Sequence, residues 1–240
     1  MCTALLLTVG IVAAVIQAVT GSGFALVAAP LVVLVAPNLL PGPLLTITTV
    51  LMIISVATSK RANLRKDARL LLPAGVGIIV GTVVSVPFLA WIGEHQKAVN
   101  VVVALGVIVA LLPPLLGRVI TTSPTRMGVG GFVAGTMTAT VALPGPPLLM
   151  VYQAPDARRY REGLAVMFLV ASVCGLVVLA PTTGLAPDGW DGIGTFVVGI
   201  VIGSVLGVVL ARRAPMGLVT MLGRVVAFVA ACLLLVSGLC

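Results

Sequence analysis

Several stretches of at least 20 residues contain no charged side chain, at 70–93, 98–117 and 163–187. A helix needs about 20 consecutive apolar residues to cross a bilayer. Over the whole chain 60% of the residues are hydrophobic and 8% are charged, whereas a soluble domain has about 25% charged residues. Such a chain cannot build the polar surface of a soluble fold, so we expect an all-α, polytopic membrane protein.

The apolar runs occur in the same order twice. Each half begins with two short runs separated by a break rich in glycine or proline, and three longer runs follow. We therefore expect two repeats, at residues 1–120 and 126–240, with broken or re-entrant helix hairpins at 4–36 and 127–154. The spans expected in the first repeat are 43–58, 70–91 and 98–116, and those in the second are 163–180, 192–211 and 216–239.

An ungapped comparison of the two halves supports the repeat. Displacing the chain by 122 positions places Gly23 on Gly145, Gly77 on Gly199 and Gly81 on Gly203. Glycines four residues apart share one helix face and allow a neighbouring helix to pack closely. Coincidence in a glycine-rich chain is the alternative, because any single match is weak. The breaks and the glycine spacing in one register favour a repeat.

The first hairpin is too short for two ordinary spans. Its runs 4–18 and 24–36 contain 15 and 13 residues, so each would extend about 20 Å as a helix. The hydrocarbon core is about 30 Å thick, which favours a re-entrant hairpin that enters and leaves on one side. Two short, kinked crossings are the alternative, and they leave the ends on the same side as well.

Basic residues are concentrated in four loops between these runs. The loops 60–69, 117–126, 155–162 and 212–213 contain 12 of the 14 lysines and arginines. The positive-inside rule makes these loops cytoplasmic and puts both termini outside. Each half then has three full crossings, so the second half is inverted relative to the first, as in many secondary transporters. Arg158, Arg159 and Arg161 are most simply topogenic, with the collection of anions as the alternative.

The two breaks are the candidate substrate site. A helix that begins inside the membrane exposes backbone N–H groups and the positive end of its dipole, which favours a bound anion. The alternative is that the breaks are kinks whose backbone groups are satisfied by neighbouring helices. The break residues expected to bind the substrate are Gly21, Ser22, Gly23 and Phe24 in the first half and Pro144, Gly145, Pro146 and Pro147 in the second.

Three further side chains are candidates for the substrate site. Thr46 and Thr49 share one helix face, but hydroxyls in membrane helices commonly bond to their own i−4 carbonyls. Arg224 would lie roughly 12 Å along a helix that starts at residue 216 and could pair with an anion there. Alternatively, Arg224 lies at the membrane interface. All six Asp and Glu occupy loops, which argues against a cation site and leaves the coupling ion, a proton or sodium, open.

Several motifs resemble the signatures of one family. The segment Gly21-Ser22-Gly23-Phe24-Ala25-Leu26, with Pro30 and Pro41-x-Pro43, is similar to the first signature of the sulfite exporter TauE/SafE family, although the commoner first motif has three glycines. Gly131-Phe132-x-x-Gly135 followed by Leu143-Pro144-Gly145-Pro146-Pro147-Leu148-Leu149 resembles the second signature. The resemblance implies a transporter of the bacterial inner membrane, and several members of the family are linked to export of sulfite or organosulfonate anions.

The residues and the resemblance together predict a secondary transporter for a small anion, such as sulfite, an organosulfonate or a related organic acid, working by alternating access. An anion channel and a membrane-embedded enzyme are the alternatives. The membrane runs contain no cysteine pair and no cluster of His, Asp and Glu, so no catalytic residue, metal or cofactor is expected. The expected partners are the small anionic substrate and the lipid bilayer, not nucleic acid, and formation of a homo-oligomer is left open.

Overall fold

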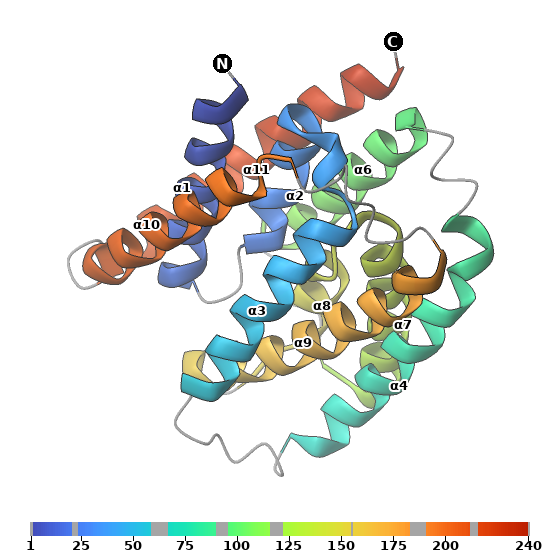
Figure 1. Ribbon diagram of the computed structural model, residues 1–240. Coiled ribbons are helices and arrows are strands. Elements are labelled where there is room, and N and C mark those ends of the chain that lie inside the picture. Colours follow the sequence, from blue (N-terminus) through green and yellow to red (C-terminus); the bar gives the residue numbers. More distant parts are fainter. Residues whose placement is uncertain are drawn as a thin grey trace.

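The computed structural model describes residues 2–20, 24–58, 67–89, 96–115, 122–154, 156–182, 191–211 and 216–239, and these are helical with no β-strand among them (Figure 1). The elements are α1 (Cys2–Thr20), α2 (Phe24–Val35), η1 (Pro37–Leu39), α3 (Gly42–Thr58), α4 (Ala68–Val84), α6 (Gln96–Leu115), α7 (Pro124–Val141), α8 (Gly145–Val151), α9 (Ala157–Thr182), α10 (Ile193–Ala211) and α11 (Met216–Leu239). The all-helical fold expected from the uncharged runs is therefore observed.

Both expected helix breaks are present. Helix α1 ends at Thr20 and α2 begins at Phe24, while α7 ends at Val141 and α8 begins at Gly145. The short second members of the pairs have 12 residues in α2 and 7 in α8, so neither is long enough to cross a bilayer by itself.

Helices α1, α4 and α9 depart from the expected runs. Helix α1 has 19 residues rather than the expected 15, so it extends about 28 Å and is nearly as long as the hydrocarbon core is thick, which the run 4–18 did not predict. Helix α4 ends at Val84, but residues 86–89 are helical again after the turn residue Ser85, so the expected run 70–91 is interrupted there. Pro87 has no N–H to continue the helical bonds, and the hydroxyl of Ser85 donates to the carbonyl oxygen of Thr82 at 2.6 Å. Such a side-chain bond competes with the helical backbone bonds.

Helix α9 begins at Ala157 rather than at residue 163, because the Asp156 carboxylate accepts from the backbone N–H of Arg159 at 2.8 Å and so caps an earlier helix start. The i,i+4 ion pair of Arg158 with Glu162 (Nε to Oε1, 2.9 Å) adds a little to this charged turn.

The close packing expected of the spaced glycines is confirmed. Gly77 and Gly81 of α4 are called here the first glycine ladder, and they pack on α7, where an added Cβ would meet backbone atoms of Gly128 and Phe132. The second glycine ladder is Gly199, Gly203 and Gly207 of α10, which packs on α1 in the same manner. Each ladder therefore contacts the first helix of the hairpin in the other half of the chain.

The outer surface of the described helices is strongly apolar. Leu72, Val177 and Val205 are 67%, 66% and 62% exposed. Large apolar patches of this kind are rare on proteins that face water, whereas hydrocarbon solvates them. Two stretches, Arg158–Pro181 and Ile193–Leu210, are long and apolar enough to cross a bilayer, and shorter apolar stretches occur at Thr3–Val19, Gly42–Ala57, Ala68–Val84 and Arg224–Val236.

The short helices α2 and α8 lie in the interior of the bundle. Helix α2 packs against α1, α6 and α11, and α8 packs against α7, α6 and α9. Residues Ala28 and Val32 of α2 and Leu148 of α8 are fully buried. The two short helices also contact one another near the middle of the molecule (Figure 1).

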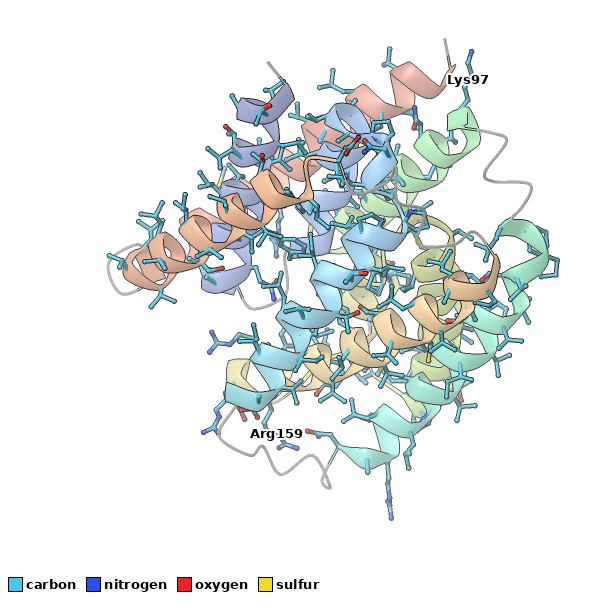
Figure 2. All side chains as sticks on the ribbon, in the orientation of Figure 1. Lys97 and Arg159 are labelled. Atoms are coloured by element: carbon cyan, nitrogen blue, oxygen red, sulfur yellow. The ribbon has the colours of Figure 1, made fainter. Side chains whose placement is uncertain are left out.

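Charged residues lie at two opposite ends of the bundle. Lys97, near the start of α6, and Arg159, in the first turn of α9, occupy opposite ends (Figure 2). The amino-terminal end of α1 and the carboxyl-terminal end of α11 lie at the end that contains Lys97 (Figure 1). Much of the basic loops falls outside the described residues, namely positions 60–66, 117–121, 155 and 212–213.

Candidate functional site

The first break is held by a side chain that the sequence reasoning did not single out. The backbone N–H of Phe24, the first residue of α2, donates to Oε1 of Gln17 in α1 at 2.9 Å. The Phe24 side chain is 2% exposed, and its ring lies 6.4 Å from the ring of Phe196 in α10. Gly21, Ser22 and Gly23 lie outside the described residues. A signal for Gln17 was present, since it is the one amide side chain in the run 4–18.

The second break is formed by the backbone itself. Ala142, directly after α7, has φ 56° and ψ 31°, the left-handed conformation that ends many helices. Its N–H donates to the carbonyl oxygen of Thr138 at 3.0 Å, and the N–H of Leu143 donates to that of Met137 at 3.3 Å. These bonds satisfy carbonyls at the end of α7, and the chain then enters α8 through Pro144.

The second break offers fewer backbone donors than a generic helix start. Proline has no N–H group, and three of the four residues 144–147 are prolines. Gly145 therefore carries the one amide hydrogen among these four residues, which are the N-cap and the first three helical positions. Gly145, Pro146, Pro147 and Leu148 are buried. At both breaks the described amide hydrogens are therefore few, and at the first break the amide of Phe24 is already bonded within the protein.

The two candidate threonines bond to their own helix. The hydroxyl of Thr46 donates to the carbonyl oxygen of Gly42 at 3.0 Å, and that of Thr49 donates to Leu45 at 2.8 Å. These are the i−4 bonds considered as the alternative to substrate binding. Each hydroxyl retains acceptor capacity only, and an oxyanion needs donors, so a substrate would have to break these bonds.

Arg224 lies within one continuous helix. Helix α11 runs from Met216 to Leu239, and Arg224 is exposed eight positions after its first residue. Its charge is close enough to act electrostatically on Tyr160 of α9. In the described structure Arg224 therefore lies on the side of the molecule where α9 begins, and no contact with either helix break is seen for it among the described residues.

A polar cluster links the two halves of the chain at the end of the bundle that contains Arg159. The guanidinium of Arg159 binds the Asp67 carboxylate with two bonds, Nη2 to Oδ1 at 2.6 Å and Nε to Oδ2 at 3.2 Å. The hydroxyl of Tyr152 donates to the backbone oxygen of Arg159 at 3.4 Å, and its ring stacks on Tyr160 with centroids 5.7 Å apart. Asp67 precedes α4, so this cluster ties the exit of α8 to the helix that bears the first glycine ladder.

The environment of Tyr152 keeps its hydroxyl protonated. Tyr152 lies in the connection between α8 and α9 and is 1% exposed. Burial, followed by the charge of Asp67, raises the pKa of Tyr152 from 10.0 to about 12. The hydroxyl therefore remains a hydrogen-bond donor at any physiological pH. Arg159 was expected to be a topogenic charge and Asp67 was not among the expected site residues, although Asp67 is the one acidic residue of the loop 60–69.

Comparison with known proteins identifies the family of this chain. No curated protein and no solved structure matches it. The family described as "Sulfite exporter TauE/SafE" matches residues 6–236, which cover both hairpins, both glycine ladders and nearly the whole chain. The protein therefore belongs to the sulfite exporter TauE/SafE family, a family of membrane transporters.

Proposed function

We propose that this protein is a secondary transporter that exports a small anion, sulfite or an organosulfonate, across the bacterial inner membrane by alternating access. Family membership supports the transport of an anion. The packing of each helix hairpin on the glycine ladder of the other half supports the mechanism. This interlocking is the observation that carries the proposal, because moving one ladder must also move a hairpin.

The two halves, residues 1–120 and 126–240, act in this proposal as inverted repeats. Several helix contacts fit an exchange of the two halves. If α1 corresponds to α7 and α4 to α10, the contact of α1 with α10 matches that of α7 with α4. If α2 corresponds to α8 and α6 to α11, the contact of α2 with α11 matches that of α8 with α6. Helix α3 also packs on α9, and α6 packs on α11. Each of these pairs consists of corresponding helices of the two halves, which a two-fold axis would bring together. An inverted pair can adopt two related conformations that open to opposite sides.

The substrate in this proposal binds between the two breaks. The N–H of Gly145 and the hydroxyl of Ser22 donate to the anion, and the positive ends of α2 and α8 lower the cost of removing it from water. Gly21 and Gly23 let the anion approach the backbone closely. Phe24 and Gly145 are buried in the described structure, and in this proposal that structure represents a closed state. A relative shift of the two hairpin and ladder units would then open the site to one side.

The orientation proposed for the protein follows the basic residues. The loops 60–69, 117–126, 155–162 and 212–213 face the cytoplasm, and both termini face the periplasm. The location of Lys97 and Arg159 at opposite ends of the bundle supports this arrangement (Figure 2). A positively charged cytoplasmic face would also raise the local concentration of the exported anion.

Flux measurements test the mechanism. Purified protein in liposomes should take up labelled sulfite or a labelled organosulfonate with a rate that saturates, and unlabelled anion on the far side should accelerate the uptake by exchange. Parallel arms with and without a pH gradient or a sodium gradient would identify the coupling ion. A linear rate without exchange would contradict alternating access and indicate a channel.

A single methyl group tests the site. A Cβ at Gly145 would lie 3.8 Å from Leu149 and 3.9 Å from Phe168, which is ordinary contact distance, so Gly145→Ala should fold normally. Because the methyl would crowd an anion bound at the N–H, we expect transport to fall about tenfold or more, the value of one bond to a charged group. Gly194→Ala is the matched control, since nothing lies within 4 Å of its Cβ position. Equal transport by the two variants would exclude Gly145 from the site.

A further inference from the structure

A groove runs along the outside of the second hairpin. It has a volume of about 570 Å³ and lies between α6 and α7, with α8 as its floor. Its walls are almost entirely apolar. The lining residues used here are Leu105 and Val109 from α6, Val129 and Val133 from α7, and Pro146 and Pro147 from α8.

The groove opens sideways, toward the hydrocarbon. Its rim residues Leu105, Val109 and Val129 are 49%, 47% and 61% exposed and belong to the apolar outer surface of the helices. An apolar groove on such a surface is filled by whatever surrounds it, which in a membrane is an acyl chain. Burial of each methylene is favourable, so an acyl chain that follows the groove gains binding energy along its whole length.

One end of the groove is basic. Thr125 and Arg126, in the first turn of α7, line this end, and both are exposed. From Arg126 to Met137, which also lines the groove, α7 rises about 16 Å at 1.5 Å per residue. That length is close to one leaflet, half of a hydrocarbon core about 30 Å thick. A phospholipid whose acyl chain fills the groove would thus have its phosphate at Arg126.

We propose that this groove binds an anionic phospholipid, with one acyl chain along α7 and the headgroup phosphate on Arg126. Basic pockets between membrane helices bind acidic headgroups in this manner. The positive end of the α7 dipole, capped by the Ser123 oxygen that accepts from the Arg126 N–H at 3.3 Å, adds to the attraction. The chain would contact Pro146 and Pro147 directly and support the short helix α8 from its lipid side.

Retention of lipid by the purified protein tests this site without any transport measurement. The detergent-solubilised protein is mixed with dioleoylphosphatidylglycerol, dioleoylphosphatidylethanolamine or free oleate, and bound lipid is counted by native mass spectrometry. We expect phosphatidylglycerol to bind more tightly than the zwitterionic lipid. Arg126→Gln should weaken it about fivefold, the effect of one basic residue near an anionic headgroup. Arg69→Gln, which removes an exposed charge from the first turn of α4, is the matched control and should leave the binding unchanged.

The groove itself is tested by filling it. Val133→Trp places a large ring in the groove and should lower the retention of phosphatidylglycerol, whereas Val205→Trp, on the exposed face of α10, should not. Equal binding of the two phospholipids, or an Arg126→Gln variant that binds like the wild type, would overturn the proposal. Oleate that binds as tightly as phosphatidylglycerol would overturn it too, because a free fatty acid would then be the better occupant. These counts of bound lipid do not depend on transport, so this test is separate from that of the proposed function.

Discussion

Each helix hairpin packs on the glycine ladder of the other half of the chain, but the two hairpins are built differently. In the first, the amide of Phe24 at the start of α2 is bonded to the Gln17 side chain of α1. In the second, the chain leaves α7 through Ala142 in a left-handed conformation and enters α8 through three prolines. Helix α8 is also held at its far end by the cluster of Tyr152, Arg159 and Asp67. The described part of the first break thus includes a side-chain bond between its two helices, while the second break is set by the stiffness of its backbone.

This difference predicts different roles in substrate binding for the two hairpins. Proline fixes φ and leaves a segment few conformations, so the second break is preorganised. The sequence of the first break contains two glycines, and the hydrogen bond from Phe24 to Gln17 between its helices can be exchanged for a bond to a ligand. We expect the first break to change conformation when the substrate binds and the second break to keep its conformation.

Substitution in the glycine ladders should have the largest effect and should be equal in the two halves. In Gly81→Val and Gly203→Val the new Cβ would meet backbone atoms of Phe132 and Ile11, which cannot move as a side chain can. We expect each to lower the free energy of unfolding by about 3 kcal/mol or more, measured by denaturation of the purified protein.

The same helices provide the controls for the ladders. Gly75→Val in α4 and Gly194→Val in α10 introduce a Cβ with nothing within 4 Å, and each should change stability by about 0.5 kcal/mol or less. If Gly203→Val changed the stability as little as Gly194→Val, the two glycine ladders would not be equivalent and the comparison of the halves would fail.

The ion pair between Asp67 and Arg159 should matter for the second hairpin only. Asp67→Asn leaves the guanidinium without its charged partner in a site where the Asp67 side chain is 11% exposed. We expect a loss of about 1 to 3 kcal/mol of stability. Addition of Arg159→Gln should cost little more, because the interaction is already broken.

The exposed ion pair between Arg158 and Glu162 is the control for the ion pair between Asp67 and Arg159. Arg158→Gln breaks the bond to Glu162, but the Arg158 side chain is 56% exposed. Its expected cost is a few tenths of a kcal/mol. Additive losses in the Asp67 and Arg159 double variant would show that the two side chains do not stabilise each other.

The bond from Gln17 should matter for the first hairpin only. Gln17→Leu keeps the size of the side chain but leaves the N–H of Phe24 without its acceptor, at an expected cost of about 1 to 2 kcal/mol. Gln153→Leu changes an exposed glutamine in the connection after α8 and should be nearly neutral. Equal thermal stability of the two variants would indicate that the bond contributes nothing to the first break.

The smallest effect should come from Ala142. Ala142→Gly removes the strain of a side chain at φ 56°, worth about 1 to 2 kcal/mol, but increases the freedom of the unfolded chain by about 0.4 to 1 kcal/mol. The net result should be a gain between about 0 and 1.5 kcal/mol. Ala139→Gly, inside α7, should instead destabilise by about 1 kcal/mol. A loss of stability in Ala142→Gly would mean that the left-handed turn is not strained.

Most of the helices could be predicted from the sequence, whereas their partners could not. The break between Val141 and Gly145 was expected because two prolines follow a glycine there, and proline cannot continue a preceding helix. The bidentate bond from Arg159 to Asp67 was not expected, since the two residues are 92 positions apart and each is also a plausible surface charge. Gln17 was missed for a similar reason, because an amide in an apolar run does not reveal which N–H it accepts from.

The sequence by itself determined that this chain is helical, apolar on its outside and interrupted at two places, because a helix satisfies its backbone hydrogen bonds locally within one long apolar run, as the interior of a membrane requires. It also determined that two helices carry faces of small residues. Only the tertiary structure decided that each such face meets the hairpin of the other half, that α2 and α8 touch, and that Arg159 reaches Asp67. These pairings depend on the fit between surfaces far apart in the chain, which no local pattern of residues encodes.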